Sequence, residues 1–133
     1  MTDCTPDNNT KERNKRMKTL IILNDSPYGT ERFYNGLRLA NNLLNSDPDG
    51  ELTVFLMADA VVGAKKGQRT PDGYYNIENM LKRVITGGGE ILLCGICEDA
   101  RGFTDDDVME GTKRSTMDEL TANTLAADKV LVF

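Results

Sequence analysis

The stretch LIILNDSPYGT, residues 20–30, decides the fold of this chain. Residues 20–23 are apolar without interruption, whereas residues 24–30 are rich in asparagine, aspartate, proline and glycine, which favour turns. An unbroken apolar run of this length that ends at a turn is typical of a strand buried on both faces, as in a parallel sheet covered by helices. We therefore expect a buried strand here, with a loop at its carboxyl end.

The same alternation of apolar runs and helical patterns continues along the chain. The predicted strands cover residues 20–23, 52–57, 90–93 and 130–133. The first predicted helix is capped by Thr30 and ends before Asp47, a weaker one lies around residues 60–62, and a third has an apolar stripe over residues 77–85. A helical turn opened by Thr104 follows. The last predicted helix is opened by Ser115 in a capping box with Asp118. This order predicts a three-layer α/β/α sandwich around a mostly parallel central sheet. Residues 1–16 are expected to form a disordered tail, and residues 17–133 the α/β domain.

The composition excludes several classes of function. The 133 residues include no histidine, which removes Ser-His-Asp and Cys-His catalysis as well as histidine-bound zinc or iron. A net charge of -5 argues against a nucleic-acid partner, because binding phosphates requires clustered lysine and arginine. No apolar stretch approaches the roughly 20 residues that span a bilayer. We therefore expect a cytoplasmic protein whose partners include neither nucleic acid nor a membrane.

Two cysteines follow the third predicted strand directly, in the sequence Cys94-Gly95-Ile96-Cys97. Because the carboxyl ends of parallel strands border the crevice in which ligands bind, residues 24–29, 58–60 and 94–101 should lie together. Backbone N–H groups at a helix start would favour the thiolate, which is the nucleophilic form of cysteine. The paired cysteines therefore predict a thiol site at this edge of the sheet.

The residues around this pair leave open whether its thiols are ionised and reactive. Glu98 and Asp99 would oppose a thiolate, and the pair could also be two buried, inert thiols. A thioredoxin-like dithiol is a further alternative, although the motif follows the third strand and not the first. Zinc would need four ligands, and Cys4 is the only other cysteine of the chain. We therefore expect no metal and no cofactor.

Three further residues at this edge are candidates for binding a substrate. Asn24 and Tyr28 lie in the loop after the first strand, and Arg101 lies four residues after Cys97. If that segment is helical, Arg101 would also favour a thiolate. Tyr28 equally fits a turn aromatic that packs on the start of the next helix.

Several segments together resemble the DsrE/DsrF-like family, which includes TusD and YchN. They are Asn24-Asp25-x-Pro27-Tyr28-Gly29-Thr30-Glu31-Arg32, Phe55-Leu56-Met57-x-Asp59-Ala60-Val61, Cys94-Gly95-x-Cys97-x-x-Ala100-Arg101-Gly102, and Ser115-Thr116-Met117-x-Glu119-Leu120 with the ending at residues 127–133. The resemblance covers residues 17–133. It implies the three-layer fold, cytoplasmic sulfur handling, and assembly into trimers or hexamers, here as a homo-oligomer.

The resemblance also implies roles for the cysteines. In the TusD branch one cysteine carries sulfur as a persulfide, and the matching position before an Arg-Gly pair is held here by Cys94, eight residues before Gly102. Cys97 departs from that single-cysteine pattern, and it could resolve the persulfide as an internal disulfide. We therefore expect Cys94 and Cys97 to be the catalytic residues of a sulfurtransferase-like carrier, with sulfur donor and acceptor proteins or small sulfane-sulfur compounds as partners. A dithiol/disulfide redox protein and a non-catalytic oligomeric binding module are the alternatives.

Overall fold

The structure, a computed structural model, describes residues 16–71 and 75–133. Its elements are β1 (Lys18–Leu23), α2 (Glu31–Ser46), β2 (Glu51–Leu56), the 3-10 helix η1 (Ala58–Ala64), α3 (Ile77–Thr86), β3 (Glu90–Cys94), α4 (Gly95–Ala100), the 3-10 turn η3 (Asp105–Asp107), β4 (Thr112–Ser115), α5 (Met117–Ala126) and β5 (Lys129–Val132). The predicted tail, apart from Arg16, lies outside the described residues.

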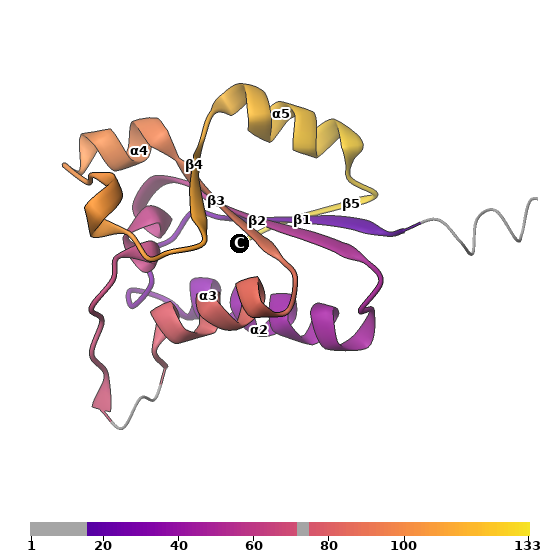
Figure 1. The fold of residues 1–133 in the computed structure, drawn as a ribbon, viewed down its shortest axis with the longest axis horizontal. Helices are drawn as coiled ribbons and strands as arrows, with labels where there is room; N and C mark the ends of the chain where they lie inside the picture. The colour runs from indigo at the N-terminus through magenta and orange to yellow at the C-terminus, as the bar shows by residue number, and fades with distance from the viewer. Residues whose placement is uncertain (1–15, 72–74) are drawn as a thin grey trace, which may run out of the picture.

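The strands form one sheet in the order β4-β3-β2-β1-β5, and each neighbouring pair runs parallel. Helices α2 and α3 cover one face of the sheet, and α4 and α5 lie over the other (Figure 1). Each predicted strand is present, and the three-layer α/β/α prediction is confirmed. Among the described residues, no helix is both long and apolar enough to cross a membrane.

The two faces of the sheet are packed unequally. The larger apolar cluster joins the sheet to α2 and α3, where Phe33, Leu37 and Leu81 are fully buried. Each such side chain contributes about 2 kcal/mol through burial. The smaller cluster, on the α5 side, consists of Leu20, Phe55, Leu92 and Leu120. Most of the fold's apolar stabilisation therefore comes from the α2–α3 face.

Strand β4 and the start of α5 differ from the sequence predictions. Residues 112–115 were not predicted as a strand, because Thr-Lys-Arg-Ser has no apolar run; as an edge strand it exposes Lys113 and Arg114. The predicted cap Ser115 is instead the last residue of this strand, and Thr116 caps α5 by accepting a hydrogen bond from the Glu119 amide at 3.1 Å. The Ser/Thr-x-x-Asp/Glu pattern fits both registers, and pairing with β3 selects the second.

The remaining caps agree with the sequence patterns. Thr30 caps α2, and its hydroxyl accepts a hydrogen bond from the Arg32 amide. Thr104 opens η3 with a capping box to Asp107, so the predicted turn is present. The weak helix expected around residues 60–62 is a longer 3-10 helix, η1, which begins directly after β2.

The packing of η1 on α2 generates a stability prediction. A Cβ at Gly63 would lie 2.5 Å from Cζ of Phe33 and 3.3 Å from Cγ2 of Ile77, in a fully buried region. We expect Gly63→Ala to lower the free energy of unfolding by about 1–3 kcal/mol, because the ring must shift. Urea denaturation measures this change. Phe33→Leu removes the tip of the ring, so the loss of unfolding free energy in the double variant should be smaller than the sum of the losses in the two single variants. A Gly63→Ala protein as stable as the parent would contradict this packing.

Candidate active site

Cys94 is placed by the direct passage of β3 into α4. It is the last residue of β3 and also the N-cap of α4, so no loop separates strand from helix. Its Sγ accepts a hydrogen bond from the Cys97 amide at 3.4 Å, and the side chain is half-buried. The sulfur therefore lies at a helix start, beside a backbone donor, as the sequence predicted.

Cys97 lies in the first turn of α4 and is also half-buried. Its Sγ accepts a hydrogen bond from the backbone N–H of Ala58, the first residue of η1, at 3.2 Å. Ala58 has φ +51°, in the left-handed region that non-glycine residues seldom adopt. The backbone after β2 therefore points the Ala58 N–H toward Cys97 Sγ, which belongs to the helix after β3.

Arg101, the C-cap residue of α4, ties the same two segments together. Its Nε and Nη2 donate to Oδ1 of Asp59 at 3.1 and 2.6 Å, and its Nη1 donates to the Cys97 carbonyl at 3.0 Å. The predicted convergence of residues 58–60 with residues 94–101 is therefore observed. The guanidinium is engaged by groups of this chain, and its role in binding a substrate stays a prediction.

The local electrostatics favour the neutral form of Cys94. Burial, and then its hydrogen bond with the Cys97 side chain, raise the pKa of the Cys94 thiol above its ordinary value. Glu98 is buried, and this burial raises the pKa of its carboxyl. Asp99 is held by Arg114 through two hydrogen bonds of 2.8 Å, which lower the pKa of Asp99. Burial and Cys97, more than the two carboxylates, therefore oppose a Cys94 thiolate.

Ser115 is a neighbour of Cys94 that the sequence analysis did not identify. The two residues are paired across β3 and β4, so their side chains lie on the same face of the sheet. Ser115 is buried, and among the described residues its Oγ has no hydrogen-bond partner. The Ser115-x-x-Asp118 spacing predicts a helix cap, so the sequence gives no sign that this hydroxyl lies beside Cys94.

The loop after β1 and the cysteines follow strands that are separated in the sheet by β2. β2 lies between β1 and β3, and the amide of Asn24 donates to the carbonyl of Phe133 beyond β5. The Tyr28 hydroxyl donates to Oε1 of Gln68, and the Tyr28 hydroxyl oxygen accepts a hydrogen bond from the Ile77 amide at 3.2 Å. No hydrogen bond in the described part of the chain joins Asn24 or Tyr28 to either sulfur. Their roles in binding a substrate stay predictions.

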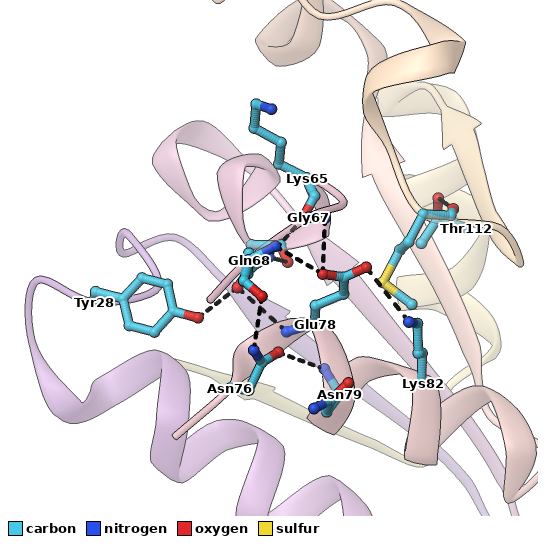
Figure 2. A network of polar contacts seen from close by, with 11 residues as sticks. Tyr28, Lys65, Gly67, Gln68, Asn76, Glu78, Asn79, Lys82 and Thr112 are labelled. Carbon is cyan, nitrogen blue, oxygen red and sulfur yellow. Dashed lines mark hydrogen bonds and ion pairs between the residues drawn. The ribbon is translucent and has the colours of Figure 1, made fainter. Parts of the chain in front are cut away.

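A network of polar contacts around Tyr28 joins residues 63–68 to the start of α3 (Figure 2). Gln68 donates from Nε2 to the carbonyls of Gly63 and Lys65 at 2.7 and 2.8 Å. The buried Glu78 accepts from the amides of Gly67 and Gln68, both at 3.0 Å. This network anchors the carboxyl end of η1, while Asp59 and Arg101 anchor its start. In the sequence, Gln68 and Glu78 resemble ordinary surface residues and carry no signal of this role.

The comparisons with known proteins agree with this architecture. The sequence model of the DsrE/DsrF-like family matches residues 17–133. The chain is 40% identical over 116 residues to protein YchN of Escherichia coli K12, covering 87% of this chain and 98% of YchN. It is 38% identical over 117 residues to the uncharacterized protein MJ0989 of Methanocaldococcus jannaschii, covering 88% of this chain and 100% of that protein.

Solved structures show the same fold. The crystal structure of E. coli YchN superposes with a TM-score of 0.84 at 39% identity, covering 88% of this chain and 99% of that one. The protein of unknown function MTH1491 from Methanobacterium thermoautotrophicum superposes with a TM-score of 0.68 at 14% identity, covering 86% of this chain and 97% of that one, and this likeness concerns the fold alone. From the match over residues 17–133 and the identity with YchN, we conclude that the chain belongs to the DsrE/DsrF-like family.

Proposed function

We propose that this chain is a cytoplasmic sulfur carrier that holds sulfur as a persulfide on Cys94. The observation that carries the proposal is the position of a half-buried Cys94 at the end of β3, one turn before a second thiol, in a member of the DsrE/DsrF-like family. The partners would be a sulfur donor and an acceptor, either proteins or small sulfane-sulfur compounds. Asn24, Tyr28 and Arg101 are proposed to bind them.

Thiol exchange supplies the chemistry without acid–base side chains of the histidine type. The Cys94 thiolate attacks the outer sulfur of a donor persulfide, R-S-SH; the new bond is Cys94 Sγ–S, and R-S⁻ leaves with the electron pair of the broken bond. The Cys94 proton passes to solvent or to the adjacent Cys97 sulfur. An acceptor thiolate repeats the attack on the outer sulfur of Cys94-S-SH. Neither transfer changes the overall oxidation state, and Cys97 is the proposed resolving thiol when no acceptor is present.

We also propose that the chain forms a homo-oligomer, a trimer or a hexamer. Support comes from the α5 side of the sheet, where Leu125 is 83% exposed and Val132 of the edge strand β5 is 64% exposed. Leu120 is the buried residue of α5, so most of this helix's apolar surface faces outward. Apolar groups gathered at an edge strand and its neighbouring helix are typical of a surface that packs against another chain.

The persulfide assignment is tested by weighing the intact protein. In a Cys4→Ser background, the reduced protein is incubated with a sulfane-sulfur donor. We expect a gain of one sulfur atom, which Cys94→Ser should abolish. Cys97→Ser should retain the added sulfur, because it lacks the thiol that would discharge the persulfide. A gain that survives Cys94→Ser would defeat the assignment. A disulfide formed in the parent, together with no sulfur gain in Cys97→Ser, would favour the redox alternative.

The raised pKa of Cys94 predicts the pH dependence of sulfur uptake. Below its pKa the thiolate fraction grows about tenfold per pH unit, so the rate should rise with pH to a midpoint above that of a free thiol. Stopped-flow assays across the pH range measure it. Cys97→Ala should move the midpoint down, since one cause of the raised pKa is removed, but burial should keep it above the free value. A rate that is flat between about pH 7 and pH 9 would contradict this.

The oligomer is tested by sedimentation velocity on the parent and on surface variants. We expect Leu125→Glu and Val132→Lys to shift the protein to smaller species, because each places a charge in the proposed interface. Asn42→Glu, a charge change at an exposed position of α2, serves as the matched control and should leave the mass unchanged. A parent protein that sediments as a monomer at micromolar concentration would refute the proposal.

A further inference from the structure

The strained residue Ala58 has a specific position in the candidate active site. In the described part of the chain, the non-glycine residues with positive φ are Ala58 and Tyr75. Strain of this kind persists where surrounding contacts hold it, and it is enriched at functional sites. The residue before it, Met57, donates its amide to the carbonyl of Leu23, and the residue after it, Asp59, is held by Arg101. The backbone is therefore fixed on both sides of the amide that reaches Cys97.

Hydrogen bonds connect the Ala58 amide, Asp59 and Arg101 to Cys97 at both its sulfur and its carbonyl. Ala58 donates its amide to Cys97 Sγ, Asp59 is its chain neighbour, Arg101 donates twice to Asp59, and the same guanidinium donates to the Cys97 carbonyl. The Arg101 side chain is 28% exposed and that of Asp59 is 65% exposed. A pair this exposed adds little to stability, so its effect lies in the direction it gives to the Ala58 amide.

The two sulfurs of the motif differ in their donors. Cys97 Sγ receives an N–H from a separate, anchored element at 3.2 Å, whereas Cys94 Sγ receives its donor from within its own helical turn at 3.4 Å. Burial and the contact with Cys97 raise the pKa of the Cys94 thiol, so the proton is retained there. Of the two cysteines, Cys97 is therefore the one whose sulfur receives a hydrogen bond from outside its own helical turn.

We propose that Asp59 and Arg101 are positioning residues that hold the Ala58 amide on the Cys97 sulfur and thereby make Cys97 the attacking thiolate of the resolving step. This inference rests on the sulfur-carrier function proposed above. In that step Cys97 Sγ⁻ attacks Cys94 Sγ of the persulfide. The Cys94–Cys97 disulfide forms, the bond between Cys94 Sγ and the outer sulfur breaks, and hydrosulfide leaves with the electron pair. The sulfane sulfur is reduced, the two cysteines are oxidised, and an external thiol reductant restores the dithiol.

The reactivity of the two thiols is measured first, without any sulfur donor. In the Cys4→Ser background, the reduced protein is alkylated with iodoacetamide over a range of pH, and the modified peptides are quantified by mass spectrometry. We expect Cys97 to be modified before Cys94. Asp59→Asn and Arg101→Lys should slow alkylation of Cys97 by about tenfold near neutral pH and move its pH profile upward, because the hydrogen bond to the charged sulfur is weakened.

A matched control is available on the same helix. Asp99→Asn makes the same chemical change and breaks the ion pair with Arg114, which joins α4 to β4 and does not contact Cys97. It should leave the Cys97 profile unchanged. Equal slowing by Asp59→Asn and Asp99→Asn would show that Asp59 merely supports the helix, and earlier alkylation of Cys94 would overturn the assignment directly. Arg101→Lys keeps the charge and serves if Asp59→Asn fails to fold.

The second readout is release of hydrosulfide from protein loaded with sulfur at Cys94. Asp59→Asn should slow this release by about tenfold relative to Asp99→Asn. If Cys97→Ser, which cannot release the sulfur by the resolving step, gains no sulfur from the donor, the sulfur-carrier proposal fails while the alkylation result still decides the positioning role. If sulfur is gained and released at the same rate in both aspartate variants, the positioning role fails and the carrier function stands.

Discussion

The parallel pairing of β3 between β2 and β4 is the constraint on which the candidate site depends. It fixes the carboxyl end of β3 beside the end of β2, where η1 begins, and beside Ser115 at the end of β4. Because α4 starts at the residue after Cys94, the strand also fixes the first helical turn and the sulfur of Cys97 within it. A flexible loop at this point would leave both thiols free to move, and the Ala58 amide would have no fixed target.

Two aspartate–arginine pairs hold α4 from opposite directions. Arg101 joins the helix to η1 through Asp59, and Asp99 joins it to β4 through Arg114. Helix α4 is six residues long, too short to be stable by its own hydrogen bonds. Exposed ion pairs of this kind contribute about 0–1 kcal/mol each, so neither explains why the fold is stable. Their geometric effects differ, since the Asp59–Arg101 pair joins the segment of the Ala58 amide to Cys97, whereas the Asp99–Arg114 pair joins the opposite side of the helix to β4.

The parts of the fold that are visible in the sequence are those set by apolar periodicity. The runs at residues 20–23, 52–57 and 90–93 predict buried strands because they are apolar apart from Thr53 and Glu90 and do not alternate with charged residues. Strand β4 has no apolar run that would predict it, because an edge strand needs backbone partners and not apolar side chains. The role of Ala58 is not predicted for a different reason: alanine carries no sign that its backbone will adopt a left-handed conformation, which tertiary contacts impose.

The division of the fold into a well-packed face and a lightly packed face separates stability from reactivity. The cluster formed with α2 and α3 contains most of the buried apolar side chains, and the cluster on the α5 side contains four. Cys94 lies at the carboxyl end of the sheet and packs against both clusters, so its backbone is anchored by the stable side while its sulfur stays half-buried. The proposed carrier role needs this combination, because a sulfur held in the centre of the larger cluster would be out of reach of a donor or acceptor.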